Sequence, residues 1–325
     1  MTKKAPFGIN SAGTSSAIIV LWVFLVLVLV TPTIAPVLAQ DGSESPVYPP
    51  WDGQRRFTVL VLGMDRRPGA RDTLNVRVDA ILIISVNPAE QSIGMLHIPR
   101  DMRMTTPYND HFFRINTLLI EGEDLQEGYG PYYAMDTFQY NLGMYIDRYI
   151  AFDFEAFITI IDALGGIDIY NPYPINDTTY PDMNYGYDPF YLAAGSHHLN
   201  GRDALRFART RHPDNDIYRG ERQMQIITAI HERISERGML PQLLQQAPQL
   251  FEELRPYIYT DLALSEILQL GAYAVSLSPE SIHTGSIDLE YSNRIPLQDG
   301  STVYIPNSDL LPELLIEVFG ERYFE

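Results

Sequence analysis

Apolar residues along the chain follow two spacings, one typical of strands and one typical of helices. Mostly apolar segments at 57–63, 80–84 and 92–99 predict strands, and the run at 80–84 is apolar on both faces, as in the centre of a sheet. Apolar residues recur at helical spacing in 132–142, 154–164, 240–255, 261–277 and 309–319. Because strands and helices alternate, the pattern predicts an α/β fold with a mixed central sheet flanked by helices.

Capping residues set the expected ends of some elements. Asp153 stands at the N-cap position of the helix at 154–164, and Gly165 and Gly166 close it. The stretch 176–191 is dense in Tyr, Asp and Asn, which predicts a surface loop.

The segment after residue 200 holds the most unusual pattern. We expect a helix that ends near Phe207. Pro213 disfavours helical geometry in the residue before it, which favours extended chain for Arg209 and Arg211. A turn and a second helix from about Ile217 are expected to follow.

The N-terminal region has the features of a targeting segment. Lysines near the start precede an apolar run at 17–30, and prolines and small residues follow it. This pattern predicts either a cleaved export signal or a retained membrane anchor, and both place the rest of the chain outside the cytoplasm. We therefore expect a signal or anchor at 1–39, a linker at 40–55 and one domain at 56–325.

Composition narrows the function. The 325 residues carry a formal net charge of −18, which argues against nucleic acid as a partner. The chain has no cysteine, so a thiolate metal site is excluded.

Arginines gather in this acidic chain between residues 206 and 225. They share a short segment with a carboxylate and an amide: Arg209, Arg211, Asp216, Arg219, Arg222 and Gln223. On a helix, positions 219, 222 and 223 share one face, and a carboxylate at 216 would cap the start. Several guanidinium groups in one volume suit a phosphate or diphosphate. The alternative is a solvated, ion-paired helix face.

Charged residues also recur at the ends of the apolar strands. Asp65 follows the first strand, and Arg77 and Asp79 begin the second, two residues apart and so expected to face the same way. Two carboxylates with phosphate and water oxygens suit Mg²⁺. The same kind of position is occupied by Arg100, Asp101 and Arg114. Isolated surface ion pairs are the alternative, but α/β sheets bind ligands at strand ends, which favours a metal-bound diphosphate.

Several ordered motifs resemble one known family. GMDRR, RVDAILIISVNP, IPRDM, RINT, AFDFEAFITIIDALGGIDI, LNGRDALRFARTR and DIYRGERQ are similar to motifs of the LytR–CpsA–Psr family of bacterial cell-wall enzymes, over about residues 56–325. The resemblance implies an enzyme outside the cytoplasmic membrane that transfers a glycopolymer from a polyprenyl-diphosphate carrier to peptidoglycan through a phosphodiester bond. It also implies an apolar tunnel for the lipid beneath the sheet, and 154–164 is a candidate wall.

The resemblance assigns roles by position. Asp65 and Asp79 match the magnesium ligands, and Arg77, Arg100, Arg209 and Arg211 match the diphosphate-binding arginines. Three further positions of a family motif are matched by Asp216, Arg219 and Gln223. Arg114 stands where many members have lysine, so its role is less defined. We expect the catalytic contacts to come from Arg100, Arg209, Arg211 and Asp216.

Two other functions remain compatible with the sequence. One is a non-catalytic polyprenyl-lipid binder or envelope regulator, and the other is a pyrophosphatase that uses water as acceptor. The general base is also open between Asp101 and Asp216.

Overall fold

The computed structural model describes residues 50–66, 74–182, 186–210, 216–235, 239, 246, 249–250, 252–297 and 302–324. The segment predicted as a signal or anchor lies outside these residues, as does most of the helix expected at 240–255. Within the described part, no helix has both the length and the apolar character needed to cross a membrane.

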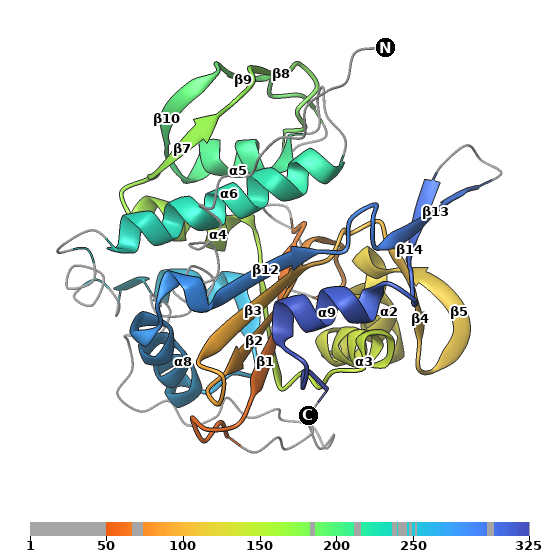
Figure 1. Cartoon of the computed structure of the whole chain (residues 1–325). Helices are drawn as coiled ribbons and strands as arrows, with labels where there is room; N and C mark the ends of the chain where they lie inside the picture. The colour runs from red at the N-terminus through yellow and green to blue at the C-terminus, as the bar shows by residue number, and fades with distance from the viewer. Residues whose placement is uncertain are drawn as a thin grey trace, which may run out of the picture.

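A six-stranded mixed sheet forms the centre of the molecule (Figure 1), in the order β11-β6-β1-β2-β3-β12. Its strands are β1 (Phe57–Met64), β2 (Val78–Asn87), β3 (Ser92–His97), β6 (Arg148–Phe152), β11 (Ile258–Thr260) and β12 (Ile282–Ser286). β2 is antiparallel to both neighbours, whereas β1 and β6 are parallel, as are β3 and β12. The α/β class, the mixed sheet and the central place of the 80–84 run are confirmed.

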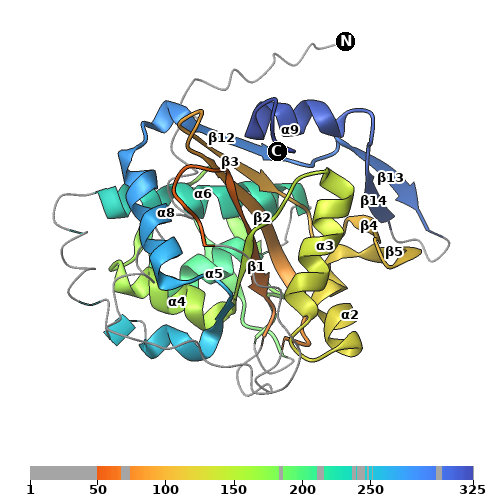
Figure 2. The ribbon, with the colours of Figure 1, turned by 90° about the horizontal axis from the view of Figure 1, so that it is seen from below.

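Helices cover both faces of this sheet, as Figure 2 shows. One face packs against α4 (Phe154–Ala163), α5 (Gly201–Arg209), α6 (Asp216–Ser235) and α8 (Leu264–Ser276). The other packs against α2 (Leu118–Leu125), α3 (Gly130–Leu142) and α9 (Leu311–Phe319). Alternate residues of β1 and β2 enter the two cores, which explains why these strands are apolar on both faces.

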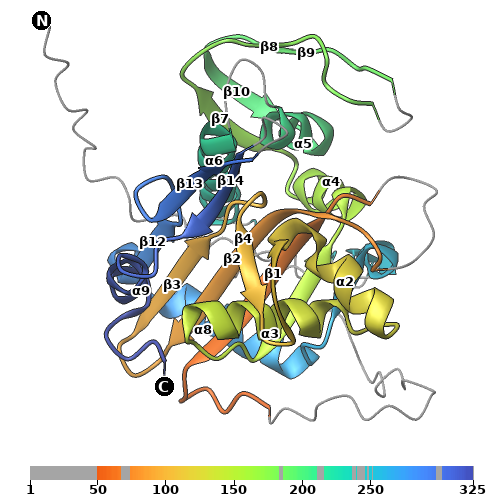
Figure 3. The same cartoon turned by 90° about the vertical axis from the view of Figure 1, so that its right-hand side faces the viewer.

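Small two-stranded sheets surround the central sheet. They are β4 (Arg103–Thr106) with β5 (Asn109–Arg114), β7 (Ile167–Asn171) with β10 (Gly195–Leu199), β8 (Ile175–Asp177) with β9 (Phe190–Leu192), and β13 (Ser292–Pro296) with β14 (Thr302–Pro306). Single-turn helices are η1 (Ile115–Thr117), η2 (Arg255–Tyr257) and η3 (Pro279–Ser281). β7–β10 and β8–β9 lie beyond α5 and α6 (Figure 3). Much of the expected surface loop at 176–191 thus belongs to the β8–β9 hairpin.

Helix boundaries follow the capping signals with one exception. The Asp153 side chain accepts hydrogen bonds from the backbone N–H groups of Glu155 and Ala156 at 3.0 and 3.1 Å, which confirms its N-cap role. α5, however, continues to Arg209, so the expectation of extended chain at this residue is wrong.

Two physical reasons account for the longer helix. The restriction that a proline imposes reaches only the residue immediately before it, and Arg209 lies further from Pro213 than that. In addition, the buried Arg222 of α6 donates hydrogen bonds to the carbonyl oxygens of Phe207, at 3.0 Å, and of Thr210. These bonds satisfy carbonyls that the end of a helix leaves without intrahelical partners.

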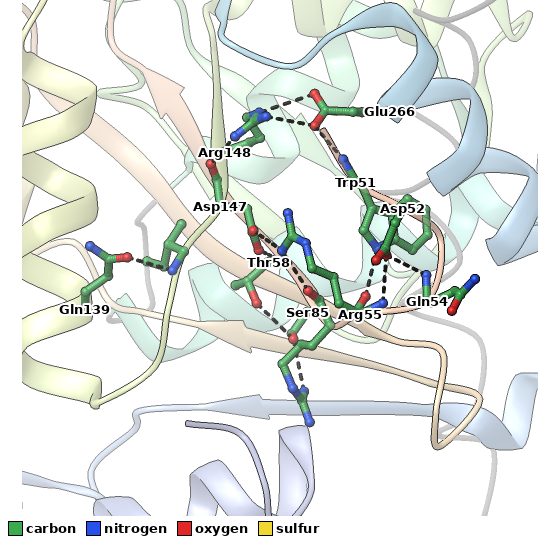
Figure 4. A network of polar contacts seen from close by, with 12 residues as sticks. Trp51, Asp52, Gln54, Arg55, Thr58, Ser85, Gln139, Asp147, Arg148 and Glu266 are labelled. Atoms are coloured by element: carbon green, nitrogen blue, oxygen red, sulfur yellow. Dashed lines mark hydrogen bonds and ion pairs between the residues drawn. The ribbon is translucent and has the colours of Figure 1, made fainter. Parts of the chain in front are cut away.

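The start of the described chain is fixed to the domain at the N-terminal end of β1 (Figure 4). Trp51 is only 3% exposed and packs on Phe57 with ring centroids 5.5 Å apart. Its backbone N–H donates to Glu266, which forms a buried ion pair with Arg148 at 2.9 Å. Packing on the domain therefore reaches back to Trp51, inside the stretch 40–55 expected to be a linker.

Candidate functional site

A β-bulge brings two aspartates to one end of the sheet. Gly63 pairs with Ala80 but Met64 pairs with Val78, so Asp79 is the extra residue on β2. Bulges redirect side chains at sheet rims and next to functional sites. Asp65 follows β1 directly, and its N–H donates to the Arg77 carbonyl at 2.8 Å. The strands that carry these aspartates are thus neighbours in the sheet.

Each aspartate lies against an arginine from another element. Asp79 forms an ion pair with Arg100, which follows β3. Asp65 is 3.6 Å from a terminal nitrogen of Arg209 at the end of α5. Both guanidinium groups are only 14% exposed, so the charges interact in a partly desolvated environment. Asp101 adds a carboxylate 3.5 Å from Nε of Arg100.

Two aromatic residues hold the Arg209 guanidinium in place. Its central carbon lies 4.1 Å from the ring centroid of Phe154, the first residue of α4. The Tyr180 hydroxyl accepts a hydrogen bond from Arg209 at 3.3 Å. Burial raises the pKa of Tyr180, so this hydroxyl stays neutral. The sequence did not indicate either partner, because both contacts depend on the packing of distant segments.

An apolar cavity of about 160 Å³ opens beside these charges. Its walls come from β1, β2, β6, α4, α5 and α6, and most of its lining is aliphatic or aromatic. The polar lining residues are Asp79, His97, Asp153, Arg209 and Gln223. The helix at 154–164 supplies wall residues, as expected, including Phe154 and Ile160. An apolar lining offers few hydrogen-bond partners to ordered water.

The arginines proposed from the sequence do not all converge on the cavity. Arg77 is exposed and is not among the lining residues, and the bulge interrupts the alternation on which its shared direction with Asp79 was based. Arg222 is buried and supports the end of α5. Arg114 ends β5, beyond Arg100. Arg211 and the side chains of Asp216 and Arg219 lie outside the described part, so their roles remain predictions.

Arg66, a buried arginine for which the sequence predicted no role, connects the elements around the site. Arg66, directly after Asp65, donates from Nε to Asp153 at 2.7 Å and from another nitrogen to the Tyr259 hydroxyl at 2.7 Å. It thereby connects the end of β1 to the start of α4 and to β11. The signal in the sequence was the first arginine of the GMDRR motif, which is uninformative without its buried partners.

The acidic residues suit one class of metal ion. Among the described residues, no group of three or more His, Cys, Asp or Glu side chains could enclose a metal. A protein-only cage is therefore not what this part of the chain offers. An ion between Asp65 and Asp79 would need phosphate and water oxygens to complete its shell, which is how Mg²⁺ is usually held, and Mg²⁺ at this pair stays a prediction.

The chain is similar in sequence to several known proteins. The chain is 31% identical over 187 residues to an uncharacterized protein of Staphylococcus aureus, covering 56% of the chain and 44% of that protein. It is 27% identical over 238 residues to the polyisoprenyl-teichoic acid–peptidoglycan teichoic acid transferase TagV of Bacillus subtilis, covering 72% and 57%. The chain thus spans about half the length of these relatives.

Solved structures share the fold. The crystal structure of B. subtilis TagV superimposes with a TM-score of 0.63 at 24% identity, over 80% of this chain and 94% of that one. A structure of TagT bound to LIIa-WTA gives a TM-score of 0.58 at 22% identity, over 82% and 92%. The family model described as the LytR_cpsA_psr family matches residues 36–317. With the fold and most of the sequence in agreement, the chain belongs to the LytR_cpsA_psr family.

Proposed function

We propose that this protein is an extracytoplasmic phosphotransferase that moves a glycopolymer from a polyprenyl-diphosphate carrier to peptidoglycan. The observation that carries the proposal is the cavity, since Asp79 and Arg209 belong both to its lining and to the charged cluster. Such a site suits a ligand with an apolar tail and an anionic headgroup. The transferase name of TagV and the ligand of the TagT complex, LIIa-WTA, support the same substrate class.

The ligand would lie across the boundary between the apolar cavity and the charged cluster. Its first isoprenyl units would enter the cavity between α4 and α6, where burial of each methylene contributes about 0.8 kcal/mol. Its diphosphate would lie against Arg100 and Arg209. Guanidinium groups bind phosphate oxygens in a fork-like geometry, and partial burial strengthens the contact.

We further propose that Asp65 and Asp79 hold Mg²⁺ when the diphosphate is present. The bound ion would supply positive charge to the phosphate oxygens as charge builds on the leaving group. In its absence, each carboxylate has an arginine partner, which keeps the acidic pair compatible with the fold. Binding the anionic headgroup would place these arginines against phosphate instead.

The reaction is a phosphoryl transfer in which positioning dominates. A sugar hydroxyl of peptidoglycan attacks the phosphorus nearer the glycan. The new phosphorus–oxygen bond replaces the bond to the bridging oxygen, and polyprenyl phosphate leaves with the electron pair. Arg100 and Arg209 stabilise the negative charge on the transferred and leaving phosphates. The proton of the attacking hydroxyl goes to a carboxylate, for which Asp101 is the described candidate and Asp216 the other.

Location follows from the same proposal. The segment at 1–39 would act as an export signal or membrane anchor, and the membrane supplies the lipid-linked donor. Peptidoglycan supplies the acceptor.

Replacement of Arg209 tests the proposal. Arg209→Ala should reduce transfer about 100-fold, the scale of losing one preorganised charge donor, and Arg211→Ala should act similarly. The assay follows the phosphodiester product from a lipid-linked glycan with and without peptidoglycan. Arg202→Ala, at an exposed position of α5, is the control and should leave transfer unchanged.

The assay also separates the alternatives. A lipid binder would retain polyprenyl phosphate, detectable by mass spectrometry, without turnover in any condition. A pyrophosphatase would release phosphate products whether or not peptidoglycan is present. Wild-type transfer by both arginine variants would contradict the role of the arginines.

A further inference from the structure

An arginine that no motif assigns lies next to the proposed diphosphate site. Arg103 begins β4, three positions after Arg100, and pairs directly with Arg114 at the end of β5. In an antiparallel pair, directly opposed side chains have Cβ atoms about 5 Å apart on the same face. The alternate residues Met102 and Met104 are buried, so Arg103 and Arg114 stand on the outer face of the hairpin.

The backbone fixes this pair close to the site. Met102 donates its N–H to the Pro99 carbonyl and accepts from the N–H of Ile115, both at 3.0 Å. The root of the hairpin is thus bonded to the turn that carries Arg100, the arginine against Asp79.

The charges of this pair are not balanced within the described part of the chain. Among the residues whose side chains the structure describes, which do not include 109–111 of the same hairpin, none forms an ion pair or a side-chain hydrogen bond with the Arg103 or Arg114 side chain. Nε of Arg103 is buried without an acceptor among them. Both side chains are partly buried. The chain contains 41 acidic and 23 basic residues, so carboxylates are abundant elsewhere. Like charges directly opposed on a hairpin are destabilising, and so is a buried donor without an acceptor.

We propose that Arg103, together with Arg114, binds a phosphate group of the lipid-linked donor and extends the anion-binding surface outward from Arg100. Two guanidinium forks on one face, at least one with an unused buried donor, match the several acceptor oxygens of a phosphate. This inference rests on the proposed function for the identity of the ligand. The phosphate can belong to the diphosphate itself or to a phosphodiester further along the glycopolymer.

Direct binding measurements with the full chain test this role and distinguish the two sources. The probes are farnesyl diphosphate, a farnesyl-diphosphate-linked disaccharide, and the same disaccharide extended by one glycerol phosphate, each titrated calorimetrically with Mg²⁺. Arg103→Gln should weaken binding about tenfold, as expected for one charge-assisted contact. A loss with all probes assigns Arg103 to the diphosphate, and a loss confined to the third assigns it to the glycopolymer phosphate.

Two further measurements exclude a merely structural role. Arg103→Gln should leave the thermal stability of the ligand-free protein unchanged or higher, because it removes a like-charge contact and a buried donor. Arg103→Lys, which keeps the charge but lacks the fork, should bind with intermediate affinity. In the double variant with Arg114→Gln, the combined loss should be smaller than the sum of the single losses.

Arg202→Gln is the matched control and should bind all three probes as the wild type does. The proposal is overturned if Arg103→Gln binds every probe within twofold of the wild type, or if it destabilises the ligand-free protein. Because binding is measured directly, a lack of transfer activity would contradict the proposed function without affecting this result.

Discussion

Two arginines of one segment have different roles, which only the structure separates. Arg209 meets Asp65 and the rings of Phe154 and Tyr180 at the cavity, whereas Arg222 donates to backbone carbonyls at the end of α5. The sequence could predict a phosphate-binding arginine cluster because strand ends and helix starts have local signals. It could not assign each arginine, since burial and the identity of the partner depend on packing between distant helices.

One partly buried acid has consequences for stability. Asp261 follows β11 and accepts a hydrogen bond from the Tyr149 N–H at 2.9 Å, while its other oxygen is buried without a donor among the described residues. Burial raises the pKa of Asp261 from 3.8 to about 6, against the opposing effect of Arg148. A raised pKa in the folded protein favours folding with the acid protonated. This contribution is complete below pH 3.8 and is lost as the pH rises through about 6.

Asp261→Asn should therefore be more stable than the wild type at pH 8, by about 1–2 kcal/mol, because the amide is neutral and keeps an acceptor for Tyr149. The difference should shrink towards pH 4. Urea unfolding at pH 4, 6 and 8 measures it, and Asp309→Asn at an exposed position is the control. A difference that does not vary with pH would contradict the explanation from burial.

At the scale of elements, the contact between α4 and α5 sets the geometry of the site. Gly201 begins α5, and a Cβ at this position would lie 2.3 Å from the Ile158 carbonyl oxygen of α4. Its N–H also donates to Asp162 at 2.7 Å. The close approach at this end determines how Arg209, at the other end of α5, lies over Phe154 of α4.

Gly201→Ala should push the two helices apart. We expect a loss of about 1–3 kcal/mol in the free energy of unfolding, from overpacking, and a loss of transfer of about tenfold or more, because Arg209 is displaced. Thermal unfolding and the transfer assay measure the two effects. Arg202→Ala, one position along on the exposed face, should change neither. If Gly201→Ala keeps normal stability and transfer activity, the contact between α4 and α5 at this position does not require glycine.

Elements with strong local signals were predictable, and weak ones were not. Asp153 caps its helix as the sequence indicates. By contrast, β4 and β5 escaped prediction because RMTTPYNDHFFR mixes polar, aromatic and turn-forming residues without clear alternation. The bulge at Asp79 was equally hidden, since it is a property of the register between two strands and not of either one.

At the scale of the whole molecule, the two faces of the sheet are used differently. The core beneath α2, α3 and α9 serves packing, whereas the core beneath α4, α5 and α6 surrounds the cavity. The sequence predicts two apolar faces from the strands. It does not state where side chains fail to fill the interior, because a cavity depends on the summed volumes of residues from several elements.

Ile230 of α6, a buried lining residue, allows the use of the cavity to be tested. Ile230→Trp should occupy part of it and weaken binding of a long-chain prenyl diphosphate about tenfold, because about two methylenes would be excluded. Binding of inorganic diphosphate should change little. Ile316→Trp, at a position of α9 that is 44% exposed, is the control. An equal loss of affinity for both ligands would indicate general structural damage and not a filled cavity.

Phe154 contacts both the apolar cavity and the Arg209 guanidinium, and this double contact has a consequence for ligand selectivity. One ring both lines the cavity and lies against the Arg209 guanidinium. Under the proposed function, a hydrocarbon tail packed on the ring would restrain it, and the restrained ring would hold the guanidinium in position for the headgroup. Binding of the tail and binding of the headgroup would then strengthen each other by the same free energy. Under the proposed function, a water-soluble diphosphate, which lacks the tail, would meet a less firmly held arginine and should bind more weakly than a lipid-linked diphosphate.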